Sequence, residues 1–401
     1  MSGTVHLRPG HVQPVWTGHP WVFAQAIARI DGDPHEGDEV RVLDPRGNFL
    51  GRGFYSPKSA IPVRILSRDA SDALTGEFFA HRLRDAATWR RSLLGLPGAD
   101  TDGFRLVHAE GDGLPGLIVD QYADVLAVQF LTIGMKRRAP EILEALVAAT
   151  GAASIVEVAS ARHQKLEGFE VREGLVAGRP IERLTFRERN FEFDLPAPGA
   201  TGAAGQKTGY YFDQRETRAV SEQLAAGRTV LDLYSYAGGF GLACARGGAK
   251  HVISVDSSAL AIDCGVQAAN RAGVSERVEW IRGDARRVMN QFDVDERRFD
   301  FVVLDPPKLA STARDLEEAR GQYRKINAAA MRLVAPGGLL LSCSCSQAVT
   351  GGDFVRTLSI SARDVRRDLT VLRWLGQPPD HPVPSAFPEG RYLKCVLARV
   401  H

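Results

Sequence analysis

From residue 227 onward, short apolar runs alternate with amphipathic segments, and this alternation constrains the fold more than any other feature of the chain. The runs have the length of buried strands and lie at 230–234, 251–256, 278–281, 299–305, 339–344, near 369–374 and at 392–400. Segments of helical periodicity, such as 258–272 and 313–334, lie between most of them. The pattern predicts an α/β fold with a mostly parallel, doubly wound sheet, which binds ligands at the carboxyl ends of its strands.

Acidic residues stand at or near the ends of four successive predicted strands: Asp232, Asp256, Asp284 and Asp305. A single Asp at such a place is often a helix cap or a turn residue, but four in register favour a ligand site. The loop after Asp232 holds Gly238, Gly239 and Gly241 just before a helix, and glycines let the backbone approach a ligand closely. The spacing is not GxGxxG, and an Asp at this place suits an amino group better than a pyrophosphate.

The same residues outline an adenosine that carries an amino acid and no phosphates. Asp256 is placed to accept hydrogen bonds from ribose hydroxyls, and Asp284 could accept one from the adenine amine. With Asp232 facing an amino group, and with Gly238 and Gly239 close to the ligand, the set predicts S-adenosylmethionine as the cofactor. A metal ion is not part of this prediction.

A second motif, Asp305-Pro306-Pro307-Lys308, follows the fourth strand, and its two prolines fix the backbone. Many nucleic-acid N-methyltransferases place an aromatic residue after such prolines, so Lys308 argues against amino-group methylation. The next strand ends in Ser342–Ser346, which brings Cys345 near Asp305. Carbon 5 of a pyrimidine becomes nucleophilic when a thiolate adds at carbon 6, and this chemistry needs such a cysteine.

A purely structural role is the alternative for Cys345, because an isolated cysteine at a strand end is usually a small buried residue. Its coincidence with the DPPK motif favours the catalytic role. A free thiol is only a few per cent ionised at neutral pH, so activation by a helix terminus or a nearby Arg is expected.

The first half of the chain lacks the alternation of strands and helices. Short β-type runs separated by turn residues predict a small β-barrel-like domain, and they lie at 38–43, 49–55 and 61–66. Helical spacing follows over 75–94 and again near 139–149, among further strands. We expect a domain at 1–72, a central α+β domain at 73–193 and the α/β domain at 194–401, in line with about 150 residues per domain.

Composition narrows the class of protein. The five cysteines are too few for a disulfide framework and favour a reducing compartment, and the N-terminus has no signal-peptide pattern, so we expect a cytoplasmic protein. The longest uncharged stretch, 333–352, contains Pro336 and several glycines, so no membrane contact is expected. The net charge of +2 means that any affinity for nucleic acid must come from local patches.

Two loops add candidate residues. Residues 206–218 are aromatic and polar and could close over the cofactor, although an edge strand would have a similar sequence. Residues 380–394 form a proline-rich loop with His381 and Glu389, and either side chain could be the base that removes a proton from carbon 5. A structural turn explains this loop equally well.

Seven motifs closely resemble the large-subunit ribosomal RNA cytosine-C5 methyltransferases, over nearly the whole chain: GHPWVF, GLPGLIVDQYADVL, QKTGYYFDQRE, DLYSYAGGFG, DPPK, SCS and DHP…FPEGRYLK. The resemblance implies an N-terminal PUA domain that binds RNA, a central α+β domain and a class I, Rossmann-like methyltransferase domain. It implies that Cys345 is the nucleophile and that Asp305 assists at the base. The donor site that it implies is lined by Phe212, Gln214, Asp232, Asp256 and Asp284.

One departure concerns the cysteine, because this chain has SCSCS where a single SCS is the rule. Cys343 could be mistaken for the nucleophile, but the residues after the motif favour Cys345. The resemblance implies 5-methylcytosine as the product, 23S ribosomal RNA as the partner, and it allows a homodimer. Two alternatives stay open: a methyltransferase for another RNA, a protein or a small molecule, and a noncatalytic RNA-binding factor in ribosome assembly.

Overall fold

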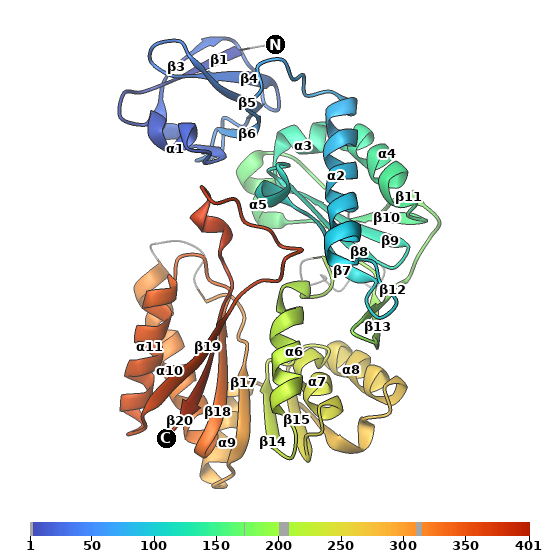
Figure 1. Cartoon of the computed structure of the whole chain (residues 1–401), viewed down its shortest axis with the longest axis vertical. Helices are drawn as coiled ribbons and strands as arrows, with labels where there is room; N and C mark the ends of the chain where they lie inside the picture. The colour runs from blue at the N-terminus through green and yellow to red at the C-terminus, as the bar shows by residue number, and fades with distance from the viewer. Residues whose placement is uncertain (1–2, 172, 200–207, 310–314) are drawn as a thin grey trace. The chain divides into compact units, whose positions relative to one another are not determined.

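The computed structural model describes residues 3–171, 173–199, 208–309 and 315–401 (Figure 1). Contacts divide the chain into two compact units. The first comprises Met1–Arg189, Leu195–Phe212 and Pro379–Gly390. The second comprises Asn190–Asp194, Asp213–Pro378 and Arg391–His401. The start of the loop predicted at 206–218 and the start of the helix predicted at 313–334 lie outside the described residues.

The first unit begins with a six-stranded sheet and the short helix α1 (Val12–Trp16). Its strands are, in spatial order, β2 (Trp21–Val22), β6 (Val63–Ser67), β5 (Phe49–Tyr55), β4 (Glu39–Leu43), β1 (Gly3–Leu7) and β3 (Ile27–Gly32). The three predicted runs are β4, β5 and β6. Gly53 of β5 is required by the pairing, because a Cβ atom there would lie 1.9 Å from the carbonyl oxygen of Arg64.

The rest of the first unit is built on a five-stranded sheet. Its order is β11 (Gly174–Gly178), β10 (Ser154–Glu157), β9 (Val125–Phe130), β8 (Leu117–Tyr122) and β7 (Gly103–His108). The other elements are α2 (Gly76–Leu94), α3 (Ile133–Arg137), α4 (Ala139–Thr150), α5 (Ala161–Glu167) and β12 (Arg183–Glu188). The next strand, β13 (Phe191–Pro196), spans the boundary between the two units along the chain. The hydrophobic core of α2, α4 and this sheet includes Phe54 and Leu66 from the first sheet. Residues 1–72 and 73–189 belong to one compact unit, while the proposed division into three domains stays a prediction.

The second unit contains the α/β sheet predicted from the alternation. Its order is β16 (Val278–Arg282), β15 (His251–Asp256), β14 (Thr229–Leu233), β17 (Phe299–Leu304), β18 (Val334–Ser344), β20 (Lys394–Val400) and β19 (Leu369–Leu375). The strands from β16 to β18 are parallel, and β20 is antiparallel to both of its neighbours. The strand order reverses between β14 and β17, which is where such sheets bind ligands.

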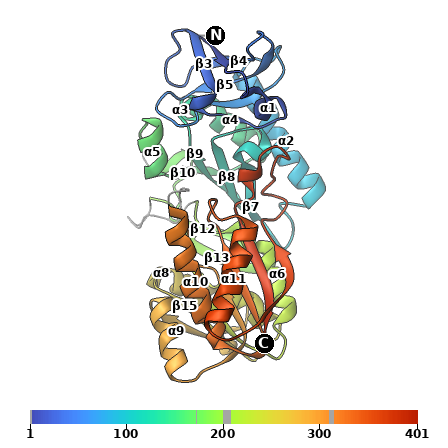
Figure 2. The ribbon, with the colours of Figure 1, turned by 90° about the vertical axis from the view of Figure 1, so that its left-hand side faces the viewer.

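Helices cover both faces of this sheet (Figures 1 and 2). One layer contains α6 (Arg215–Leu224), α7 (Gly239–Arg246) and α8 (Ala259–Arg271). The other contains α9 (Ala285–Val294), α10 (Leu316–Leu333) and α11 (Gly351–Asp364), which bury a continuous apolar core against the strands. Among the described residues, no helix is both long enough and apolar enough to span a bilayer.

Candidate methyl-donor and thiol site

The carboxyl ends of the parallel strands bring together most of the residues predicted from the sequence. Asp256 ends β15, Asp305 directly follows β17, and Asp284 lies two residues after β16. Asp232 lies in β14 and pairs in register with Val303 of β17. The acidic residues therefore occupy four strands that are consecutive neighbours in the sheet.

Asp232 is the most perturbed of these carboxyl groups. It is 1% exposed, and its Oδ2 accepts a hydrogen bond of 2.8 Å from the backbone N–H of Gly241, while Oδ1 is buried without a hydrogen-bond partner. Burial raises the pKa of Asp232 to about 7, and the nearby charges of Asp305 and Asp256 add to the effect. An unpartnered buried carboxyl oxygen fits a cationic ligand group such as the amino group of an amino acid.

The loop after β14 has an unusual backbone. Tyr234, Tyr236 and Gly238 all have positive φ angles, of 63°, 52° and 76°, and Gly239 begins α7. A Cβ atom on Gly238 would lie 2.3 Å from the ring of Trp280, so only glycine fits there. Backbone strain of this kind is concentrated at ligand sites, and here it follows directly after Asp232.

Asp256 and Asp284 each have a local structural role. Asp256 accepts backbone hydrogen bonds of 2.8 Å from Tyr236 and from Ser258, so it fixes the glycine loop and the start of α8. Asp284 caps α9, because its Oδ1 accepts a 3.0 Å bond from the N–H of Arg287. The ordinary roles considered for these residues are therefore present, and the proposed contacts with a ribose and an adenine stay predictions.

Gln214 contacts Asp305 directly. Its Nε2 donates a 3.1 Å hydrogen bond to Asp305 Oδ2, and its Oε1 accepts one of 3.4 Å from the Cys395 thiol. Gln214 is 2% exposed, so the amide is held firmly between β17 and β20.

The two cysteines of the SCSCS motif differ sharply in their surroundings. Cys343 lies inside β18 opposite Cys395, is fully buried, and burial raises the pKa of its thiol well above the ordinary value. Cys345 follows the end of β18 and is partly exposed. The backbone N–H of Leu309, next to the DPPK motif, donates a 3.2 Å hydrogen bond to Ser346 Oγ. That bond ties the loop of Cys345 to the loop of Asp305.

Sequence reasoning missed the residues that support this loop. Ser344 Oγ donates a 2.9 Å bond to the hydroxyl of Tyr323 in α10, which lies 3.0 Å from Ser346 Oγ. Ser342 Oγ donates likewise to Asn327 Oδ1, at 2.5 Å. The sequence signal for these contacts was a serine at every second position of an otherwise apolar strand. Alternate residues of a strand point to the same face, so the hydroxyls need polar partners on that face.

Lys394, at the start of β20, was also missed. Its Nζ donates hydrogen bonds to the carbonyl oxygens of Ser346, at 2.6 Å, and Tyr392, at 2.7 Å. The sequence signal for a role of Lys394 was a lysine at the start of an apolar strand. The activating cation expected beside the thiol was an Arg or a helix terminus, whereas the charges that interact with Lys394 include Cys345 and Lys308.

Three predicted site residues belong to the first unit. Phe212 is 1% exposed and packs in an aromatic cluster with Tyr122, Phe186 and Tyr210. His381 is buried, with Nδ1 3.2 Å from Asp380 Oδ1, and its ring centre lies 5.0 Å from that of His108. Glu389 Oε2 lies 3.2 Å from His19 Nε2. Their predicted roles at the donor and the base are not tested by these contacts.

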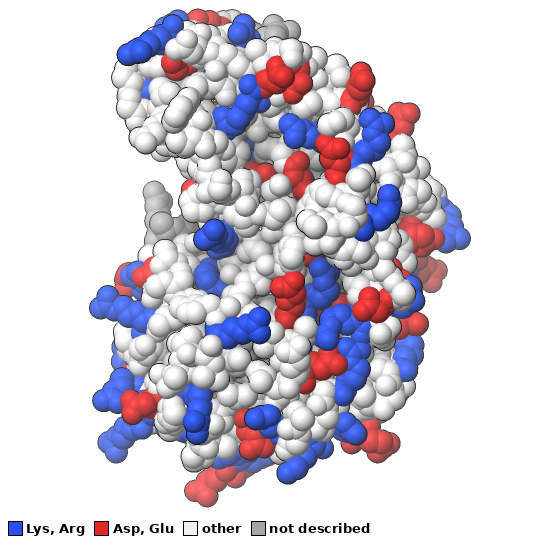
Figure 3. All heavy atoms as spheres, in the orientation of Figure 1, with Lys and Arg blue, Asp and Glu red and all other residues white. Residues whose placement is uncertain are grey.

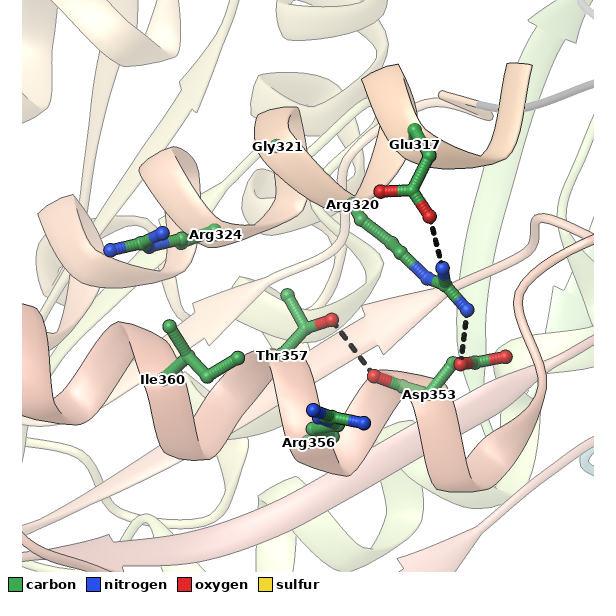
Figure 4. Close-up of a pocket in the computed structure, with 8 residues that line it drawn as sticks. All are labelled: Glu317, Arg320, Gly321, Arg324, Asp353, Arg356, Thr357 and Ile360. Carbon is green, nitrogen blue, oxygen red and sulfur yellow. Dashed lines mark hydrogen bonds and ion pairs between the residues drawn. The ribbon is translucent and has the colours of Figure 1, made fainter. Parts of the chain in front are cut away.

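A separate groove of about 410 Å³ lies between α10 and α11 (Figure 4). Three arginines line it, but Arg320 pairs with Glu317 and Asp353, and Arg324 pairs with Asp364. These ion pairs offset most of the positive charge. Basic and acidic side chains are also interspersed on the face drawn in Figure 3. Among the described residues, no cluster of three or more His, Cys, Asp or Glu side chains is arranged to hold a metal ion.

Comparisons with known proteins agree with this arrangement. Residues 5–68 match the family of PUA-like domains, and residues 104–398 match the family described as S-adenosylmethionine-dependent methyltransferase. Proteins named ribosomal RNA large subunit methyltransferase I are 36% identical in Shewanella denitrificans, over 100% of both chains, and 35% identical in Photobacterium profundum, over 98% of both.

Solved structures share the fold over the full length. A candidate methyltransferase complexed with SAH has a TM-score of 0.86 at 18% identity, and a candidate SAM-dependent methyltransferase from Streptococcus mutans has 0.84 at 18% identity, each covering 100% of both chains. The expected α/β methyltransferase sheet and N-terminal PUA-like domain are thus confirmed. The chain belongs to the S-adenosylmethionine-dependent methyltransferase family, with a PUA-like domain ahead of the methyltransferase region, and S-adenosylmethionine is its cofactor.

Proposed function

We propose that this protein methylates carbon 5 of a cytosine in large-subunit ribosomal RNA, with Cys345 as a covalent nucleophile. The proposal rests on the neighbouring carboxyl ends of β17 and β18. Cys345 follows β18 and is partly exposed, Asp305 follows the parallel neighbour β17, and the bond from Leu309 to Ser346 joins the two loops. Amino-group or hydroxyl methylation needs no thiol at this place.

The proposed chemistry balances without a further reagent. The Cys345 thiolate forms a bond to carbon 6, and the electron pair of the carbon 5–carbon 6 double bond makes carbon 5 nucleophilic. Bound S-adenosylmethionine would supply the methyl group to carbon 5, and the broken sulfur–methyl bond would leave S-adenosylhomocysteine. A base then removes the proton from carbon 5, the double bond re-forms and the thiolate leaves. His381 and Glu389 stay the candidates for that base, and Asp305 is assigned to assist at the cytosine ring.

The donor is assigned to the strand ends of β14, β15 and β16. Asp232 would bind its amino group, since a buried carboxyl oxygen there has no other partner. Gly238 and Gly239 would let the backbone approach the ligand, and Asp256 and Asp284 would accept hydrogen bonds from ribose and adenine. Phe212, Gln214 and Asp305 complete the proposed lining of the site.

The choice of RNA rests on two comparisons. The relatives that are 35–36% identical over nearly the whole chain are named as large-subunit ribosomal RNA methyltransferases. A PUA-like domain also precedes the methyltransferase region. A methyltransferase for a small molecule would need neither the domain nor the thiol, and a noncatalytic RNA-binding factor would not need DPPK beside SCS.

The product test uses ribosomal RNA transcribed in vitro and S-adenosylmethionine with a deuterated methyl group. After incubation with the protein, mass spectrometry of the digested RNA should find the label in 5-methylcytidine. The matched control is the Cys345→Ala protein, which should leave the RNA unlabelled. Label in an N-methylated or O-methylated nucleoside would contradict the cytosine-C5 assignment.

Asp256→Ala should weaken donor binding, because a hydrogen bond to a charged acceptor contributes about 1.5–3 kcal/mol, or roughly 10- to 150-fold in affinity. Calorimetry with S-adenosylhomocysteine measures the change. Asp300→Ala is the control, since Asp300 also accepts a backbone bond, from Thr229, but lies at the opposite end of the strands. Equal affinity in both variants would place Asp256 outside the donor site.

A further inference from the structure

Lys394 is joined to the loop of the proposed nucleophile by direct contacts. It is the first residue of β20 and pairs with Ser344, the last residue of β18. Its Nζ donates to the carbonyl oxygen of Ser346, the residue that follows Cys345, and to that of Tyr392. Lys394 is 8% exposed, and an ammonium group has three donors. Two acceptors among the described residues, the carbonyl oxygens of Ser346 and Tyr392, lie within hydrogen-bond distance of Nζ.

Burial of the Lys394 ammonium group costs free energy unless hydrogen bonds or a negative charge compensate it. Burial lowers the pKa of Lys394 to about 8, while interaction with the thiolates of Cys345 and Cys395 acts in the opposite direction. The interaction is reciprocal, since an ammonium that a thiolate stabilises also stabilises that thiolate. The buried Lys394 therefore acts electrostatically on the partly exposed Cys345, in addition to its hydrogen bonds to the backbone.

Other charged and titratable groups surround the pair. Lys308, after β17, lowers the pKa of Lys394 by repulsion, so a second cation lies near the same place. Asp305 and Cys345 both interact with the Tyr323 hydroxyl from α10, whose pKa burial raises to about 12. Tyr323 thus stays neutral at ordinary pH, and Lys394 and Lys308 supply positive charge to the cluster.

We propose that Lys394 is a positioning residue that holds the backbone after Cys345 and stabilises the thiolate form of that cysteine. The thiol proton passes to solvent, and Lys394 keeps its own proton. The inference deepens the proposed function, because it matters for methyl transfer only if Cys345 is the nucleophile.

The test measures the reactivity of Cys345 rather than methylation. The purified full-length protein is treated with iodoacetamide between pH 5 and 10, and mass spectrometry with fragment assignment follows the alkylation of Cys345. The other four cysteines are buried, which makes Cys345 the accessible thiol. The variants are Lys394→Met and Lys394→Gln, which remove the charge, and Lys394→Arg, which retains it. Lys325→Met is the matched control, because Lys325 is an exposed lysine of α10.

In the unmodified protein, the pH midpoint of alkylation should lie below about 8.5, the value of a free cysteine. Lys394→Met and Lys394→Gln should raise the midpoint by about one unit and lower the rate at pH 7 about threefold, because the more basic thiolate is intrinsically more nucleophilic. Lys394→Arg should restore the midpoint, and Lys325→Met should not move it.

A midpoint at or above the free-cysteine value in the unmodified protein would overturn the inference, whatever the variants do. An unchanged midpoint in a folded Lys394→Met or Lys394→Gln protein would show that Lys394 does not stabilise the thiolate and only holds the backbone. The two proposals fail separately. If the midpoint depends on Lys394 while methylation survives Cys345→Ala, the electrostatic role stands and the nucleophile assignment falls.

Discussion

Cys345→Ala is expected to abolish methyl transfer, whereas Cys343→Ala should retain most of it. Loss of a covalent nucleophile removes the reaction path itself, and single losses of this kind lower turnover by roughly 1,000-fold or more. Cys343 is fully buried in β18 opposite Cys395, so its substitution changes packing. We expect that change to cost about 1–2 kcal/mol of stability and little activity.

Initial rates of methyl incorporation into ribosomal RNA, measured beside thermal unfolding, separate the two effects. Both variants should bind S-adenosylhomocysteine with normal affinity, because neither cysteine is assigned to the donor site. Activity that survives in Cys345→Ala but disappears from a folded Cys343→Ala protein would reverse the assignment of the nucleophile.

Asp232→Asn is expected to weaken donor binding by at least about tenfold. The amide oxygen can still accept the hydrogen bond from Gly241, so the loop should keep its conformation. What the substitution removes is the negative charge on a buried, otherwise unpartnered oxygen. Calorimetry with S-adenosylhomocysteine at pH 8 measures the loss, and normal affinity in the variant would mean that Asp232 does not bind the amino group.

The raised pKa of Asp232 fixes the direction of two pH effects. Burial moves this pKa from 3.8 to about 7, so ionisation disfavours the folded protein without ligand. The contribution of Asp232 to stability is fully present below about pH 4 and is lost as the pH rises through 7. Asp232→Asn cannot ionise and should therefore raise the melting temperature at pH 8 while it weakens the donor. Donor affinity in the unmodified protein should increase through pH 7, because the carboxylate is the form that binds an ammonium group.

The sequence predicted the α/β unit well because its signal is local. Most residues of β14, β15, β17 and the second half of β18 are buried, so these strands appear in the sequence as continuous apolar runs. The acidic residues lie at or near the strand ends, where sheets of this topology bind ligands. The first sheet was predicted only in part. β2 has only two residues, and β3 has no fully buried side chain. Neither strand therefore shows the alternation of apolar and polar residues from which a strand is predicted.

The site residues that the sequence did not predict are held by partners distant in sequence. Lys394 reaches Ser346 across the antiparallel pair of β18 and β20, a pairing that no local pattern encodes. Tyr323 reaches the same loop from α10. Phe212 was assigned from the resemblance to the donor site, and its described contacts are aromatic neighbours of the first unit. The sequence allowed a capping role for Asp284, and the backbone shows that this residue caps α9.

The most direct test of a covalent cytosine-C5 mechanism is trapping with RNA that contains 5-fluorocytosine. Once carbon 5 bears both fluorine and the new methyl group, no proton remains there, and the thiolate cannot leave. We expect a protein–RNA adduct that needs S-adenosylmethionine, that maps by mass spectrometry to Cys345, and that forms in Cys343→Ala but not in Cys345→Ala. A protein that binds the donor and methylates RNA, yet forms no adduct with both thiols intact, would contradict the mechanism.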